Sequence, residues 1–185
     1  MHADFDTAVL GLAMPADVEE ALREAGDHRG DAPRAMAALM RAQALAPEHP
    51  AVLIAFYRHH FYGHRLRPAR DVARRALAIG ARALGLPAVW RDVPAAPLPG
   101  ARHHAGTRFF LFVLKGYAYL SLRLGDDTEA RDALALLRAV DPHDCVGAAV
   151  LEAVRLRAAA PPDDDAADVA AYVQATGAAA WAALR

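Results

Sequence analysis

Two short helical patterns separated by a turn occupy residues 114–144, and they constrain the fold more than any other stretch. Apolar residues recur three or four positions apart in both patterns, as they do on one face of a helix. The first set is Leu114, Tyr117, Ala118 and Leu122, and the second is Ala130, Leu134 and Leu137. A Gly-Asp-Asp turn at residues 125–127 separates them, and the proline after Asp141 ends the second pattern. The stretch predicts a hairpin of two antiparallel helices.

Caps and prolines predict further helices along the chain. Asp31 caps one helix with Pro33 in its first turn, and Pro50 opens another that runs to Gly63. Others are expected at about residues 15–25, 66–84, 107–124, 127–140 and 144–160, with a last helix from Asp163. Residues 1–13 have no clear cap, so they form either a short helix or an arm packed on the first hairpin.

Small residues reveal an internal repeat. Ala35 and Ala42 recur as Ala69 and Ala76 after 34 residues, whereas Ala130 follows Ala69 after 61. An insertion of 27 residues therefore separates the second and third hairpins. Residues 86–104 contain four prolines and predict an irregular loop, more mobile than the helices and placed at a groove mouth. Its apolar residues Trp90, Val93 and Leu98 are expected to pin it to the helices.

This period resembles that of the tetratricopeptide repeat family. The matching residues are Gly30, Ala35, Ala42 and Pro47 in the first unit, Ala69 and Ala76 in the second, and Gly125, Ala130 and Pro142 in the third. Leu137, Ala81 and Ser121 depart from the family pattern. The resemblance implies an all-α superhelix of stacked hairpins over residues 17–158, with the first helices lining a concave groove. Another kind of helical bundle is the alternative.

Composition favours one helical domain over residues 1–185 in the cytoplasm. Ala, the strongest helix former, supplies 47 residues. A net charge of −1 argues against nucleic acid or an anionic membrane as partners. The longest strictly apolar run, residues 109–114, is far shorter than the ~20 residues of a membrane span. The single Cys145 and the acidic start argue against a secreted, disulfide-bonded protein.

The repeat positions place cations and aromatic rings on the groove side of two first helices. These residues are Arg58, Phe61, Tyr62, Phe112, Lys115, Tyr119 and Arg123. Lys115, Tyr119 and Arg123 are four residues apart and share a helix face, as do Arg58 and Tyr62. Cations beside rings suit an acidic or aromatic peptide. The alternative is that the rings belong to the core and the cations are solvated.

Histidines offer a second hypothesis. His60 and His64 lie one turn apart, and His103 and His104 precede the next groove helix, so together they could hold a transition metal. Neither a His-Glu-x-x-His motif nor a Cys pair is present, and surface or packing histidines are the better explanation. Cys145 and the arginines of residues 67–82 have structural explanations as well. No phosphate loop, nucleophile elbow or catalytic carboxylate pair occurs.

The sequence therefore predicts a non-catalytic scaffold without a cofactor, such as an adaptor, chaperone or assembly factor. Its groove is expected to bind a protein or peptide that is acidic or aromatic. A metal-binding accessory protein is the alternative. The pattern leaves the oligomeric state and the partner's identity open.

Overall fold

The structure is a computed structural model that describes residues 13–159. Seven α-helices and one short 3-10 helix occur in this range, and none of its residues lies in a strand, so the predicted all-α class is confirmed. The helices are α2 (Ala16–Asp27), α3 (Ala32–Leu45), α4 (Pro50–Tyr62), α5 (Leu66–Ala83), η2 (Trp90–Asp92), α6 (Ala105–Arg123), α7 (Asp127–Val140) and α8 (Ala149–Ala159). Predictions for residues 1–12 and for the helix after Asp163 lie outside the described residues.

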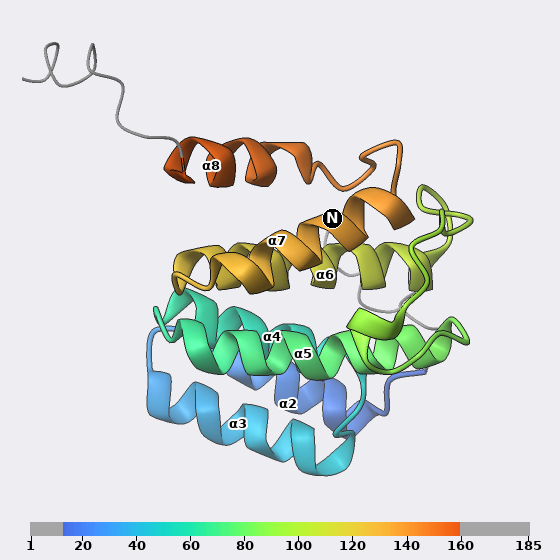
Figure 1. The fold of residues 1–185 in the computed structure, drawn as a ribbon. Helices are drawn as coiled ribbons and strands as arrows, with labels where there is room; N and C mark the ends of the chain where they lie inside the picture. The colour runs from blue at the N-terminus through green and yellow to red at the C-terminus, as the bar shows by residue number, and fades with distance from the viewer. Residues whose placement is uncertain (1–12, 160–185) are drawn as a thin grey trace, which may run out of the picture. The chain divides into compact units, whose positions relative to one another are not determined.

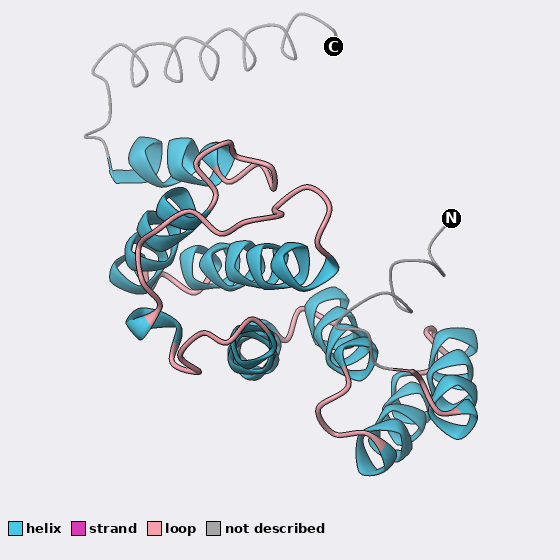
Figure 2. Cartoon of the chain, turned by 90° about the vertical axis from the view of Figure 1, so that its right-hand side faces the viewer, coloured by secondary structure: helices cyan, strands magenta, loops and turns pink. Residues whose placement is uncertain are grey.

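The described residues up to Glu152 belong to one compact unit, and the end of α8, from Ala153, belongs to a second. Within the first unit, consecutive helices pair as hairpins: α2 with α3, α4 with α5, and α6 with α7 (Figure 1). Helix α5 also packs along α6, which joins the second hairpin to the third. The view in Figure 2 shows these helices connected only by loops. The prediction of one domain over residues 1–185 stays a prediction.

Local signals set most helix ends where the sequence predicts them. The Asp31 carboxylate accepts a hydrogen bond from the Arg34 amide at 3.1 Å, as expected of an N-cap. Helix α7 has the predicted bounds. Helix α8 begins at Ala149 instead of next to Asp144, because Asp144 adopts a left-handed conformation with φ 50°. Its carboxylate still accepts from the Ala148 and Ala149 amides, so it caps the helix from four to five residues away.

Small residues lie where helices approach one another. The five alanines of the repeat are all buried: Ala35, Ala42, Ala69, Ala76 and Ala130. Gly80 of α5 shows how close the packing is, because a Cβ added there would lie 3.1 Å from Phe109 Cδ1 of α6. The α5–α6 approach therefore depends on the missing side chain at Gly80.

The connection between α5 and α6 is irregular except for η2, and it is fastened to the helices at several points. Trp90 and Val93 are buried, and the Trp90 ring lies 5.8 Å from that of Tyr117 in α6. The Leu98 amide donates to the Val140 carbonyl at 2.9 Å. Trp90, Val93 and Leu98 thus pack against the helices, as the sequence predicts; greater mobility of the loop stays a prediction.

Glu129 of α7 is the polar centre of this attachment. Tyr117 donates its hydroxyl proton to the Glu129 carboxylate, and Arg91 donates to both carboxylate oxygens. Arg74 of α5 donates to the Tyr117 hydroxyl oxygen at 3.3 Å. Burial alone would raise the pKa of Glu129, but the hydrogen bonds from Arg91 and Tyr117 outweigh it and lower the pKa. The charged carboxylate is therefore the form that holds the connection.

Replacing Ala130 by Leu should overpack a helix crossing and lower the free energy of unfolding by about 1–3 kcal/mol. Urea denaturation measures the change. Ala135→Leu is the matched control, since Ala135 is exposed on the same helix. Equal stability of the two variants would contradict the assigned crossing.

Replacing Glu129 by Gln should lower the free energy of unfolding by about 1–3 kcal/mol at pH 7, because it removes a charged acceptor. The folded-state pKa is lowered, so this stabilisation is present above the unfolded pKa and disappears as pH falls through the folded pKa. Denaturation series at decreasing pH should show the wild type and the variant converging. Glu20→Gln, in an exposed ion pair, should show almost no difference at any pH.

Candidate functional site

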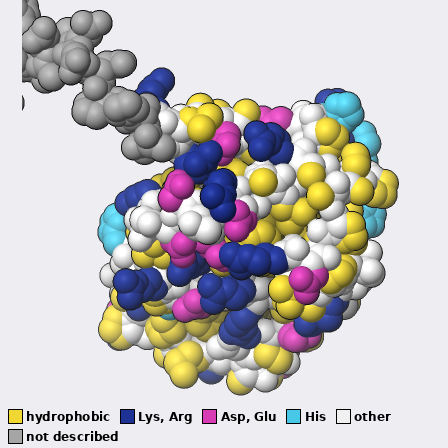
Figure 3. Space-filling view, viewed as in Figure 1, with side chains coloured by type: hydrophobic (Ala, Val, Ile, Leu, Met, Phe, Trp, Pro, Cys, Tyr) yellow, Lys and Arg dark blue, Asp and Glu magenta, His cyan; other side chains and the backbone are white. Residues whose placement is uncertain are grey.

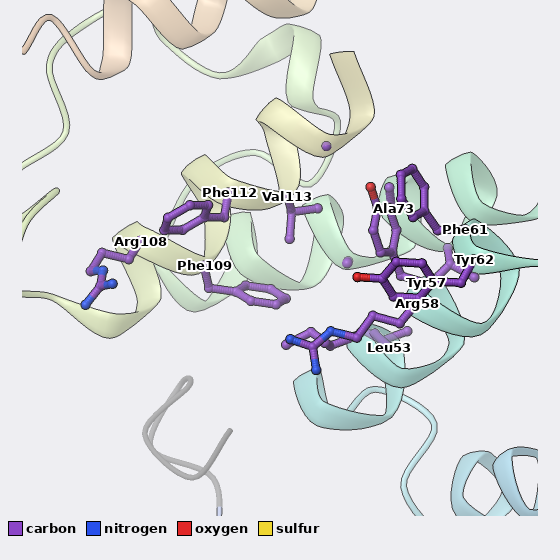
Figure 4. Close-up of a pocket in the computed structure, with 14 residues that line it drawn as sticks. Leu53, Tyr57, Arg58, Phe61, Tyr62, Ala73, Arg108, Phe109, Phe112 and Val113 are labelled. Atoms are coloured by element: carbon purple, nitrogen blue, oxygen red, sulfur yellow. The ribbon is translucent and has the colours of Figure 1, made fainter. Parts of the chain in front are cut away.

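A pocket of about 400 Å³ opens between α4, α5 and α6 (Figure 4). Phe109, Phe112 and Val113 reach it from α6, opposite Tyr57 and Arg58 of α4. The complete lining is Leu53, Ile54, Tyr57, Arg58, Phe61 and Tyr62 from α4, Val72, Ala73 and Ala76 from α5, and Arg108, Phe109, Phe112, Val113 and Gly116 from α6. The volume suits one large side chain and its neighbours.

The pocket combines apolar walls with two guanidinium groups. Its lining is mostly aliphatic and aromatic, and Arg58 and Arg108 are its charged residues. Two of its rings are also accessible to solvent: Tyr62 is 74% exposed and Phe112 is 43% exposed. Exposed rings grouped around a hollow mark a binding surface more often than scattered single ones do. Such a surface suits an apolar or aromatic group that lies beside a negative charge.

Aromatic rings form a continuous row from α4 to α6. Tyr57 stacks on Phe61 with ring centroids 5.8 Å apart, and Phe61 lies 5.9 Å from Tyr119. Arg123 extends the row, since it donates to the Tyr119 hydroxyl at 2.7 Å and lies over that ring. The row places further flat surface and a further cation next to the pocket.

Tyr57 fits between the helices because residue 116 is glycine. A Cβ added to Gly116 would lie 3.1 Å from the Tyr57 hydroxyl oxygen. Glycine inside a helix costs about 1 kcal/mol relative to alanine, so this contact gives the glycine a packing reason. Burial, followed by the nearby Tyr119 and Tyr62, raises the pKa of Tyr57 to about 12. The hydroxyl is therefore neutral at physiological pH.

The predicted groove residues fall into three groups. Arg58, Phe61, Tyr62 and Phe112 line the pocket. Tyr119 and Arg123 do not line it but continue the row of rings. Lys115 is outside the pocket lining, and its ammonium group donates to the Val146 carbonyl at 2.6 Å. Lys115 therefore holds the segment after α7, a contact that helix-face spacing could not reveal.

Sequence reasoning missed several lining residues, chiefly Tyr57, Arg108 and Gly116. Spacing contained usable signals for the first two: Tyr57 is four residues before Phe61, and Arg108 is four before Phe112. Each missed residue therefore shares a helix face with a predicted one, Tyr57 with Phe61 and Arg108 with Phe112. An isolated glycine in the apolar pattern of α6 was the signal for the third.

The four histidines predicted as possible metal ligands have separate positions in the structure. His104 caps α6, because its Nδ1 accepts from the Thr107 amide at 3.1 Å. His64 lies exposed in the α4–α5 turn, and His103 lies in the turn before α6. Burial, then Arg65 and His59, lowers the pKa of His60. Among residues 13–159, no three His, Cys, Asp or Glu side chains gather as they would around a metal ion.

Charges elsewhere on the described surface are mixed. Basic and acidic side chains lie side by side across the face drawn in Figure 3. Short ion pairs account for several of them, including Arg70–Asp126 at 3.0 Å and Arg82–Glu48 at 3.0 Å. No helix in the described part of the chain is long and apolar enough to cross a membrane.

Comparison with known proteins identifies a relative. The chain is 35% identical over 155 residues to a protein of Azotobacter chroococcum mcd 1 described as "Uncharacterized 19.8 kDa protein in nifW 5'region", covering 80% of this chain and 84% of the relative. The chain belongs to the family of that protein. No family model matches the chain, and no solved structure matches it.

The Gly116 contact can be tested by a double-mutant cycle. Gly116→Ala should stabilise the chain more in a Tyr57→Phe background than in the wild type, because the hydroxyl that meets the new methyl group is then absent. A coupling of about 0.5–1.5 kcal/mol in urea denaturation is expected for groups in contact. Strict additivity would show that the Tyr57 hydroxyl does not approach residue 116.

Proposed function

We propose that this chain is a non-catalytic cytoplasmic scaffold that binds a segment of another protein in the α4–α6 pocket. The observation that carries the proposal is the pairing of exposed aromatic walls with Arg58 and Arg108 in one pocket. No step of chemistry is required of these residues. An adaptor, a chaperone or an assembly factor would use such a site.

The lining defines the ligand that would fit. An aromatic or large aliphatic side chain would displace water from the exposed rings of Tyr62 and Phe112, and this burial of apolar area favours binding. A neighbouring carboxylate would accept charge-assisted hydrogen bonds from a guanidinium group. The proposed partner segment therefore places an acidic residue directly beside an aromatic one.

The tetratricopeptide-like arrangement belongs to the same proposal. The pocket lies between α4 and α6, which are the first helices of the second and third hairpins. First helices line the groove in that family. The buried alanines at the repeat positions support the same arrangement.

The relative suggests one partner to examine. Its name places it in the 5′ region of nifW. Where the host of this chain carries nifW, its product is a candidate to test by copurification.

Peptide binding to the full chain tests the proposal. We expect a fluorescein-labelled peptide with a central Asp-Phe-Asp to bind more tightly than the same peptide with Asp-Ala-Asp or Lys-Phe-Lys. Arg58→Glu should weaken the first by on the order of tenfold, since losing a charge-assisted contact costs about 1.5–3 kcal/mol. Added salt should weaken it as well.

Arg138→Glu is the control, because Arg138 is exposed on α7 outside the pocket lining. Fluorescence anisotropy gives the affinities. Equal binding of the three peptides, or equal loss in the two variants, would sink the proposal.

A further inference from the structure

The chain carries its own candidate ligand for the α4–α6 pocket. Residues 4–6 read Asp-Phe-Asp, an aromatic side chain with a carboxylate on each side. The pocket presents aromatic walls together with Arg58 and Arg108. Charge and ring chemistry are therefore complementary within one polypeptide.

The connection to the described chain puts these residues within reach. Met14 packs against a hydrophobic cluster that includes Leu53, Val72 and Phe109, three residues that also line the pocket. Phe5 is nine residues before Met14, and nine extended residues span up to about 30 Å. Helix α4, with 13 residues, is only about 20 Å long. The tether therefore starts at a cluster that shares residues with the pocket, and it is long enough to reach the pocket.

We propose that Phe5 docks into the α4–α6 pocket of its own chain, with Asp4 and Asp6 placed at Arg58 and Arg108. Docking in cis has an entropic advantage, since a short tether supplies an effective concentration on the order of millimolar. A contact whose dissociation constant is about a tenth of that concentration then occupies the pocket about nine-tenths of the time. Residues 1–12 act as an internal pseudo-ligand that a partner must displace.

This inference rests on the ligand chemistry of the proposed function and deepens it by specifying regulation. A partner segment would bind by presenting the same combination of ring and carboxylates, or a better one. The apparent affinity for that segment falls in proportion to the fraction of chains whose pocket is open. A pocket occupied for about nine-tenths of the time would therefore bind a partner about tenfold more weakly.

Photo-cross-linking tests the docking directly. The full chain is made with p-benzoylphenylalanine in place of Phe5, irradiated, and digested for mass spectrometry. The expected adducts join residue 5 to α4 and α6 peptides that contain Phe61 or Phe112. The same probe in place of Thr7 is the control and should give fewer of these adducts.

Mixing isotopically heavy and light chains before irradiation shows whether the pocket holds the N-terminal segment of its own chain or that of a second copy. Adducts within one chain support the proposal, whereas heavy–light adducts show that a second copy fills the pocket and overturn it. Adducts that map only to other helices, or none at all, also overturn it.

A charge exchange provides a second, independent measurement. Arg58→Glu should reduce the adduct several-fold, as should Arg108→Glu, and combining both with Asp4→Arg and Asp6→Arg should restore most of it. Arg138→Glu should leave the yield unchanged. Loss without recovery in the combined variant would show that the charges do not meet and would overturn the assigned pairing.

Peptide binding by a Phe5 variant distinguishes failure of the docking proposal from failure of the proposed function. Phe5→Ala should strengthen binding of the labelled Asp-Phe-Asp peptide by on the order of tenfold. One outcome is that residue 5 cross-links to the pocket but the Phe5→Ala chain binds no added peptide. That outcome would support docking and contradict the proposed function. If Phe5→Ala leaves peptide binding unchanged and residue 5 gives no adduct in the pocket, the proposed function is supported and docking is contradicted.

Discussion

The hydroxyl of Tyr117 joins the parts of the first compact unit on which the pocket depends. Its ring is fully buried in α6, and its hydroxyl meets Glu129 of α7 and Arg74 of α5. Trp90 of the intervening connection packs on the ring. A buried hydroxyl needs hydrogen-bond partners, so one side chain ties the position of α6 to three other elements. Helices α5 and α6 in turn supply eight of the fourteen residues that line the pocket.

Local features of the sequence were sufficient to predict the seven α-helices that the structure describes. Caps and prolines act within one or two turns of a helix end. The capping role of Asp31 and the bounds of α7 could therefore be predicted from neighbouring residues. The start of α8 could not, because Asp144 turns left-handed while the Val146 amide donates to the Asp141 carboxylate. The Val146 carbonyl in that turn accepts a hydrogen bond from Lys115, which lies 31 residues earlier in the chain.

The candidate site was predictable to the extent that it follows helix faces. Spacing along α4 and α6 placed Arg58, Phe61 and Phe112 on one side, and all three line the pocket. Spacing along one helix does not show which distant segment supplies a hydrogen-bond partner. Lys115 therefore looked like a groove cation although a backbone carbonyl binds it, and His104 looked like a metal ligand although it caps α6.

The connection between α5 and α6 is attached at points rather than along its length, and this has an evolutionary consequence. Trp90 and Leu98 hold it to α6 and α7, while residues 94–97 and 99–104 are largely exposed. Lengthening an exposed loop changes its closure entropy only slightly. Insertions and deletions in homologous chains should accumulate in those two stretches, and the pocket-lining helices can keep their spacing while the loop diverges.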